Sequence, residues 1–177
     1  QIPVGSSEDF TAIIDLLTRK MATFTGDKGT TVTWQEVPSE YKNQVEELRL
    51  KIVEKACDLD ENLADKFLNE QEITLPEIKA ALRQGVIDRK VTPAFCGTAF
   101  KNKGVQLLLD AVVDYLPSPL DIPDVQSADK TQSRKADDNE PFSALVFKIM
   151  TDPFVGALSF TRVYSGKIKA GSYVYNL

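Results

Sequence analysis

The chain has 177 residues, 42% of them apolar and 27% charged, with 21 basic against 26 acidic side chains for a net charge of −5. These values are typical of a folded, mildly acidic protein of one or two domains. Because the sequence contains no histidine, Ser-His-Asp and Cys-His catalytic sets and histidine-ligated zinc are excluded. Cys57 and Cys96 are too few for a cysteine-only zinc site or a disulfide framework, so we interpret them as reduced thiols in a cytoplasmic protein. No apolar run approaches the ~20 residues of a membrane span, so no membrane partner is expected.

The ends of the sequence and its charge distribution predict a divided chain. It begins at Gln1 rather than Met and stops within residues 171–177, a stretch rich in strand-forming residues, so we expect a fragment of a longer protein. Residues 1–90 carry 12 basic and 17 acidic groups, a net charge of −5, whereas residues 125–177 carry 7 and 5, a net charge of +2. The proline-rich, polar stretch between Pro117 and Pro141 is interpreted as a linker.

The first 34 residues predict short β-strands. Strand-forming residues occur at Ile2 and Val4 and within residues 12–17, 20–25 and 31–34, and a turn is expected at residues 26–29. A small hairpin is the predicted outcome.

From Ser39 the hydrophobic period becomes helical. Ser39 follows a proline and is expected to cap a first helix, and Asp60 a second one. Thr74 and Glu77 have the spacing of a capping box at the start of a third helix. The predicted inner faces consist of Tyr41, Val45, Leu48, Ile52 and Ala56, then Leu63, Ala64, Phe67 and Leu68, then Ile78, Leu82 and Val86.

Residues 91–116 have the pattern of strand, loop and helix. Residues 91–96 are predicted to form a strand, which Pro93 weakens, and residues 97–104 a polar loop. The helix that follows has Val105, Leu108, Leu109, Val112, Val113 and Leu116 on one predicted inner stripe. This arrangement is a half-unit of an α/β fold, in which ligands bind at the carboxyl ends of strands.

Beyond the linker the period becomes two, as in a β-meander or barrel. Leu145, Phe147 and Ile149 alternate, and so do Leu158 and Phe160, which predicts about three strands, too few to close a barrel. Four basic residues stand against one acid, Asp152, in residues 141–177; they are Lys148, Arg162, Lys167 and Lys169. A nucleic-acid contact and ordinary surface charge are both compatible with that composition.

No complete nucleotide site is present in the sequence. It contains neither a Walker-type glycine loop ending in Lys-Ser or Lys-Thr nor an Asn-Lys-x-Asp motif. We therefore predict no catalytic residue, no metal site and no bound cofactor for this chain alone. Most of the acidic side chains of residues 39–89 are interpreted as a solvated surface, with Glu46, Glu47 and Glu54 pairing with Lys51 and Lys55.

Four separated motifs together resemble one known family. They are Gln1–Gly5; the run VTPAFCGTAFKNKGVQ at 91–106; LDAVVDYLPSP at 109–119; and FKIMTDPFVG at 147–156 followed by RVYSG at 162–166. In this order they resemble the bacterial elongation factor G family of translational GTPases, over essentially the whole chain.

The resemblance implies a domain map and a fold class. Residues 1–90 correspond to an insert subdomain within the GTPase domain, 91–120 to the last strand and helix of that domain, 121–140 to a linker and 141–177 to the first strands of a second-domain β-barrel. The implied fold class is α/β, an α+β insert plus the end of a P-loop GTPase domain, followed by a partial all-β barrel. The family's phosphate loop, Mg²⁺ ligands and guanine motif would all precede Gln1.

The resemblance also implies a function, a site and partners. The parent would hydrolyse GTP with Mg²⁺ and move tRNA and mRNA on the ribosome, and Thr98 and Ala99 would form its guanine-binding loop, where the family usually has Ser-Ala. The implied partners are the ribosomal stalk protein for residues 1–90 and small-subunit ribosomal RNA for the barrel, with the protein a cytoplasmic monomer. Two alternatives remain: a related translational GTPase of release-factor recycling or ribosome protection, and a non-enzymatic ribosome-binding module.

Overall fold

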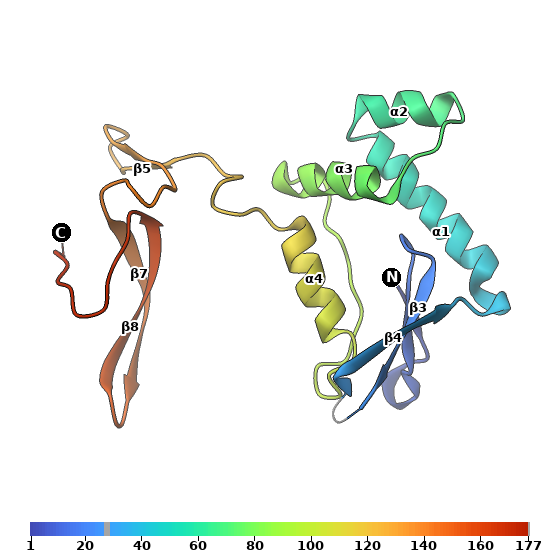
Figure 1. The fold of residues 1–177 in the computed structure, drawn as a ribbon, viewed down its shortest axis with the longest axis horizontal. Helices are drawn as coiled ribbons and strands as arrows, with labels where there is room; N and C mark the ends of the chain where they lie inside the picture. Colours follow the sequence, from blue (N-terminus) through green and yellow to red (C-terminus); the bar gives the residue numbers. More distant parts are fainter. Residues whose placement is uncertain (27–28, 177) are drawn as a thin grey trace. The chain divides into compact units, whose positions relative to one another are not determined.

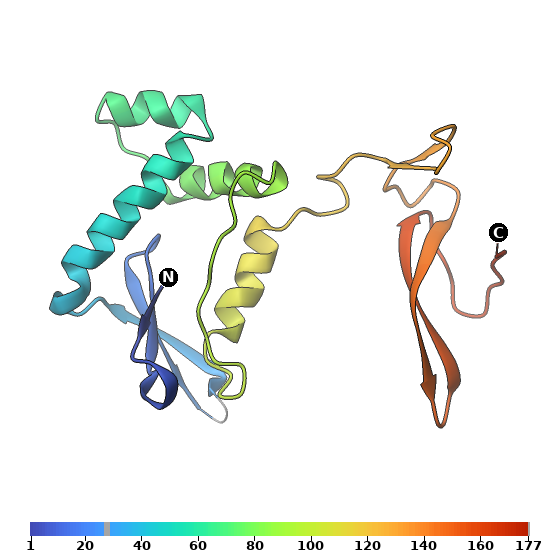
Figure 2. The ribbon, with the colours of Figure 1, turned by 180° about the vertical axis from the view of Figure 1, so that it is seen from behind.

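The computed structural model describes residues 1–26 and 29–176, which fall into two compact units, Gln1–Leu116 and Pro117–Leu177. The chain is a mixture of helices and β-strands (Figures 1 and 2). In the described residues every ladder between named strands is antiparallel. The fold is therefore a mixed α and β fold with antiparallel sheets, which is compatible with the predicted class without singling it out.

A four-stranded antiparallel sheet opens the first unit. Its strands are β1 (Ile2–Val4), β2 (Ala12–Asp15), β3 (Lys20–Thr25) and β4 (Thr31–Glu36), and they pair in chain order. A short 3-10 turn (Ser7–Asp9) joins β1 to β2. The predicted strands are confirmed, but they form one sheet rather than a small hairpin. Of the turn predicted at 26–29, residues 27 and 28 lie outside the described residues.

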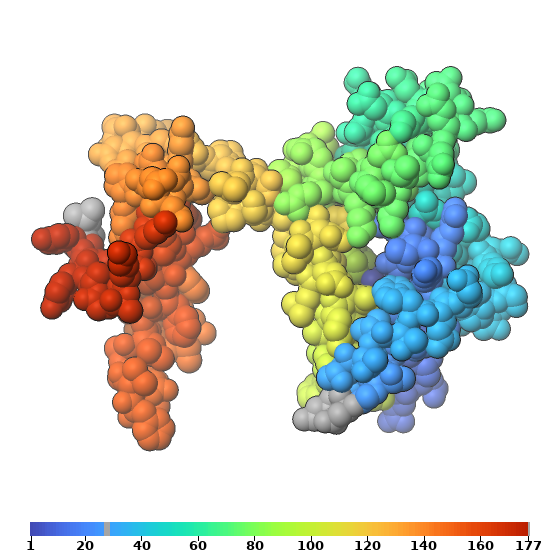
Figure 3. All heavy atoms as spheres, in the orientation of Figure 1, coloured from blue at the N-terminus to red at the C-terminus, as the bar shows by residue number. Residues whose placement is uncertain are grey.

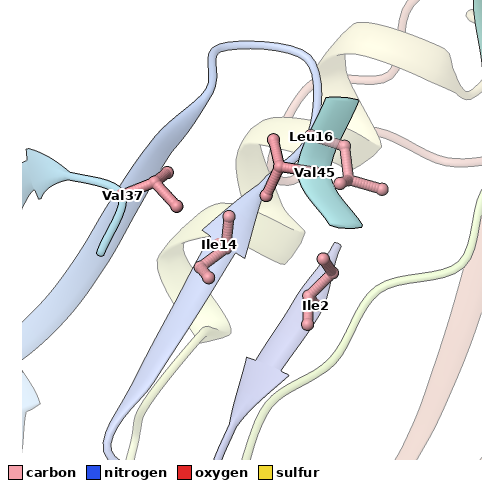
Figure 4. Close-up of a cluster of buried hydrophobic side chains, with 5 residues drawn as sticks. All are labelled: Ile2, Ile14, Leu16, Val37 and Val45. Carbon is pink, nitrogen blue, oxygen red and sulfur yellow. The ribbon is translucent and has the colours of Figure 1, made fainter. Parts of the chain in front are cut away.

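Both faces of this sheet are covered, which explains the apolar run in β2. Ile13 and Ile14 are each 0% exposed although they point to opposite faces. Ile14 packs in a cluster with Ile2, Leu16, Val37 and Val45, in which α1 (Ser39–Cys57) covers one face (Figure 4). Ile13 packs on the other face with Ala22, against the partly buried Cys96 and Leu107. The sheet is thus the central layer of the first unit.

Three helices make a second core beside the sheet. After α1 come α2 (Glu61–Leu68) and α3 (Leu75–Ile87), and the three helices bury Ala56, Leu63, Ile78 and Ala81 against one another. The predicted inner positions Leu63 and Ile78 are confirmed. Phe67 and Leu68 were expected inward but are 39% and 78% exposed, because in the described chain no element packs on that side of α2.

Of the three predicted helix caps, two are confirmed and one is wrong. Asp60 accepts hydrogen bonds from the backbone N–H groups of Asn62 (2.8 Å) and Leu63 (3.4 Å), and the capping box of α3 is present. Ser39 does not cap α1: it is the first helical residue and Pro38 occupies the cap position without a side-chain bond. The proline ring fixes φ at the cap position, but proline has no side-chain acceptor, so α1 begins without a side-chain cap.

Glu77 anchors the start of α3. Its carboxylate accepts from the backbone N–H (2.9 Å) and the hydroxyl (2.8 Å) of Thr74 and forms an ion pair with Lys66 of α2. The bond from Lys66, followed by those from Thr74, lowers the pKa of Glu77 to about 2 from an ordinary value of 4.5.

This shift predicts an acid-sensitive helix start. Because the folded-state pKa is depressed, the stabilisation is fully present above about pH 4.5 and is lost as the pH falls towards about 2. We expect Glu77→Gln to remove most of the pH dependence of amide protection at the start of α3, measured by hydrogen exchange between those pH values. Glu72→Gln, an exposed carboxylate without a hydrogen bond among the described residues, is the control. An unchanged pH profile in Glu77→Gln would contradict the assignment.

The strand predicted at 91–96 is not formed. These residues contain no strand, and α4 (Val105–Tyr115) follows the loop as expected. A strand needs a hydrogen-bonded neighbour, and in the described residues none lies beside this segment; Pro93 also lacks an N–H. The N–H of Cys96 donates instead to the side chain of Gln1 (3.2 Å).

The buried face of α4 is not the predicted one. Ala111 and Tyr115 are the buried residues of this helix, at 7% and 6% exposure. The predicted inner stripe is largely exposed: Leu108 is 48% exposed, Leu109 60%, Val112 43%, Val113 78% and Leu116 52%. In the described chain the sheet and α3 lie against the opposite side of α4, so the larger apolar face has no cover.

The second unit consists of two hairpins. A short one, β5 (Val125–Gln126) with β6 (Ser133–Arg134), lies inside the segment predicted as linker and corrects that prediction. The long one pairs β7 (Ser143–Asp152) with β8 (Gly156–Ser165). The third predicted strand is absent from residues 166–176. Both faces of the β7–β8 hairpin are largely exposed. The alternation of apolar residues therefore predicted the positions of these strands correctly, although neither face is buried in the structure.

Candidate functional site

The loop at residues 97–104 is a tight, backbone-bonded turn. Thr98 and Lys103 exchange two hydrogen bonds, of 2.9 and 3.1 Å, and the N–H of Asn102 donates to the carbonyl of Ala99 (3.0 Å). Asn102 and Gly104 have positive φ values of 50° and 86°. The loop therefore has one defined backbone conformation that leads from the extended segment into α4.

Two lysine side chains fasten this loop to the connection between β1 and β2. The ammonium of Lys103 donates to the carbonyl of Phe10 (2.9 Å), and that of Lys101 donates to the carbonyl of Glu8 (3.5 Å). The side chain of Gln106 donates to the carbonyl of Gly29 (3.2 Å). No sequence signal indicated these roles, because each depends on segments 77 or 93 residues apart in the chain folding next to one another.

Ala99 lies on the surface of this turn. The residue is exposed, and within the described part of the chain its N–H donates no hydrogen bond. Thr98 is half-buried, and among the described residues its hydroxyl has no partner, so the loop is braced by backbone bonds rather than by this side chain. The two predicted site residues are thus adjacent on one turn, with a free donor at Ala99.

Within residues 1–26 and 29–176, no group of three or more acidic or cysteine side chains is placed to hold a metal ion. Burial raises the pKa values of Cys57 and Cys96, which keeps both thiols protonated at neutral pH.

Charged side chains of α1 form ion pairs on the surface of the first unit. Glu47 and Lys51 pair at 2.7 Å as predicted, whereas Lys55 pairs with Asp58 at 3.2 Å and Glu46 with Arg19 at 3.1 Å. Exposed pairs of this kind contribute little stability and exchange partners readily.

The long hairpin of the second unit combines aromatic rings with cations. The Lys148 ammonium lies 5.8 Å from the centre of the Phe160 ring, and the Arg162 guanidinium lies 5.3 Å from that of Tyr164. Cations beside exposed aromatic faces are the groups with which proteins contact phosphates and stack on bases.

None of the described helices has the length and apolar character that crossing a bilayer requires.

Comparison with known proteins gives a similarity of fold. The sequence matches no protein-family profile. Its fold is similar to a crystal structure of a protein from Thermus thermophilus, with a TM-score of 0.73 and 25% sequence identity. The match covers 97% of this chain and 23% of the Thermus protein. This chain therefore has the fold of a stretch that makes up about a quarter of that longer protein.

Proposed function

We propose that this chain is part of a ribosome-dependent translational GTPase that resembles elongation factor G, and that residues 97–104 form its guanine-binding loop. The observation that carries the proposal is the Ala99 N–H: it belongs to an exposed residue on a tight turn between an extended segment and a helix, and it donates no hydrogen bond among the described residues. The four motifs of the sequence support it, and so does a structural neighbour in which the same fold belongs to a longer chain.

The chemistry of the loop accounts for a choice of guanine over adenine. A backbone N–H at Ala99 donates to the O6 acceptor of guanine, whereas adenine presents an N–H₂ donor at that position. Adenine would leave both donors unpaired, which costs about 1–3 kcal/mol for each buried polar group. In the complete protein, phosphate contacts and Mg²⁺ ligands would come from other segments, and the chain alone is expected not to bind or hydrolyse GTP.

Removal of this donor tests the proposal. In the complete gene product we expect Ala99→Pro to weaken GTP binding by about 5- to 150-fold, the equivalent of one lost hydrogen bond, and to leave the weak binding of ATP unchanged. Ala99→Gly, which retains the N–H, is the matched control. Titration with a fluorescent guanine nucleotide measures both variants, and equal affinity for GTP in wild type and Ala99→Pro would contradict the assignment.

The encoding gene and the reaction of its product distinguish an elongation factor from the two alternative functions. A gene that encodes a phosphate loop and Asn-Lys-x-Asp upstream of Gln1, and whose product hydrolyses GTP faster with ribosomes, identifies a translational GTPase. Translocation of tRNA and mRNA then distinguishes a cytoplasmic elongation factor from a recycling or ribosome-protection GTPase. A gene without those motifs favours a non-enzymatic ribosome-binding module.

We also propose that residues 1–90 dock a protein, the ribosomal stalk, rather than RNA. Their net charge of −5 opposes binding to phosphates, and α1 to α3 present charged surfaces without a catalytic set. The basic hairpin β7–β8, with its cation–ring pairs, is instead the segment suited to small-subunit ribosomal RNA.

An amide NMR titration checks this assignment. We expect the C-terminal domain of the stalk protein to shift resonances within residues 1–90 in fast exchange, as a small transient interface does, and to leave those of residues 143–165 unmoved. The spectrum of the hairpin is the internal control. Absence of any shift between Gln1 and Lys90 at millimolar partner would overturn the docking proposal.

A further inference from the structure

The loop at residues 97–104 lies against segments from the start of the chain. Figures 1 and 2 show it at the end of the sheet where β4 begins. In the first turn of α4, Leu107 packs on the buried cluster that contains Ile13, and Figure 3 shows the yellow atoms of α4 against the blue atoms of the strands. A β-carbon added to Gly29 would lie 2.9 Å from the carbonyl oxygen of Lys101, so the chain just before β4 lies close against the loop.

Lys103 makes a short, partly buried hydrogen bond from the loop to the connection between β1 and β2. Its ammonium donates to the carbonyl of Phe10 over 2.9 Å, whereas the ammonium of Lys101 reaches the carbonyl of Glu8 over 3.5 Å in an exposed contact. Phe10 itself is 7% exposed and belongs to the buried cluster. A charged donor away from bulk water forms a stronger hydrogen bond than an exposed one, so the Lys103 bond is the firmer of the two.

Lys103 also closes the turn that carries Ala99. Its backbone exchanges hydrogen bonds of 2.9 and 3.1 Å with Thr98, the residue directly before Ala99. Residues 99–101, at the tip of the turn, are all exposed. The position of the tip is therefore set from the base of the turn, where the Lys103 side chain is bonded to the Phe10 carbonyl.

We propose that Lys103 is a positioning residue of the guanine-binding loop, whose bond to the Phe10 carbonyl fixes the turn that presents the Ala99 N–H. The inference rests on the proposed function. Lys103 acts on the nucleotide through the backbone of Thr98 and Ala99 rather than by contact. Without its bond the turn samples other positions, and the affinity falls with the fraction of molecules whose loop is correctly placed. A segment near the start of the chain thus contributes to guanine affinity.

Hydrogen exchange on this chain measures the order of the turn without any nucleotide. Lys103→Met retains the aliphatic stem and removes the ammonium. We expect the amides of Thr98 and Asn102, which donate within the turn, to exchange about tenfold faster, while amides in the middle of α3 keep their protection. Lys101→Met is the matched control, because it removes the same charge from the same loop but only the exposed 3.5 Å contact. Lys103→Arg, which retains a donor, should restore the protection.

Nucleotide titration of the complete gene product measures the consequence for binding. We expect Lys103→Met to weaken GTP binding about fivefold, which corresponds to a correctly placed loop in about one molecule in five, and to leave the weak binding of ATP unchanged. Lys101→Met should bind GTP as wild type does, and Lys103→Arg should recover most of the affinity. In an Ala99→Pro background Lys103→Met should cause no further loss, because the donor that it positions is absent.

The outcomes separate this inference from the proposed function. If Ala99→Pro weakens GTP binding but Lys103→Met does not, the positioning role is wrong and the guanine-binding loop stands. The same holds if Lys103→Met leaves the exchange of Thr98 and Asn102 unchanged, or if it weakens GTP binding equally with and without the Ala99 N–H. If Ala99→Pro itself binds GTP as tightly as wild type, the guanine-binding loop is wrong, and the positioning role is overturned with it.

Discussion

Replacement of Ile78 by alanine is expected to lower the free energy of unfolding of residues 1–116 by about 2–5 kcal/mol. Ile78 is 0% exposed and lies at the centre of the cluster in which α1, α2 and α3 meet. Removal of its side chain loses the transfer free energy of the buried methyl groups and leaves a cavity that the surrounding helices close only in part. Urea denaturation followed by circular dichroism measures the change.

An exposed leucine on the neighbouring helix supplies the control. Leu68 is 78% exposed on α2, so Leu68→Ala should change the free energy of unfolding by no more than about 0.5 kcal/mol. If both variants unfolded at the same urea concentration, the three helices would not share the cluster seen in the structure.

The second large effect is expected at Gly104, where the loop at residues 97–104 enters α4. This buried glycine has a φ of +86°, and a β-carbon added to it would lie 2.7 Å from the Cδ1 of Ile13 and 2.8 Å from the carbonyl oxygen of Cys96. The left-handed conformation costs a non-glycine residue about 1–2 kcal/mol, and overpacking a core adds about 1–3 kcal/mol. We expect Gly104→Ala to destabilise the first unit by about 2–5 kcal/mol in total.

Gly156 isolates the conformational part of that cost. It has a φ of +85°, but nothing lies within 4 Å of an added β-carbon, so Gly156→Ala should cost only the roughly 1–2 kcal/mol of the backbone conformation, within its own hairpin. Amide hydrogen exchange measures both variants. Retention of wild-type protection at Thr98 and Lys103 in Gly104→Ala would show that the loop can relax around the new methyl group.

A displaced loop would also have a functional consequence. Gly104 lies beside Gly97 and the Cys96 carbonyl, so a shift there moves the turn that presents the Ala99 N–H. In the complete protein, Gly104→Ala should therefore weaken guanine nucleotide binding more than Gly156→Ala does, under the proposed function.

The sequence by itself determined the local elements of this protein. Strand-forming residues located β1 to β4, β7 and β8, and the helical period located the four α-helices of the described residues. Asp60, Thr74 and Glu77 were identified as capping residues because a cap is satisfied within three residues of chain. The candidate site residues Thr98 and Ala99 were found through the family motif, and the structure adds the backbone conformation of their turn.

The tertiary structure alone decided how those elements are covered. Periodicity identified an apolar stripe on α4, but Ala111 and Tyr115 are buried and the stripe is exposed, because the neighbours of a helix are set by distant segments. Residues 91–96 read as a strand yet pair with none of the described strands, since strand formation requires a partner that the segment cannot encode. The roles of Lys101 and Lys103 likewise depend on carbonyls 93 residues away. Hydrogen bonds between residues close in the chain, such as helix caps, can be predicted from the local sequence. Burial and strand pairing cannot, because they depend on packing between distant segments.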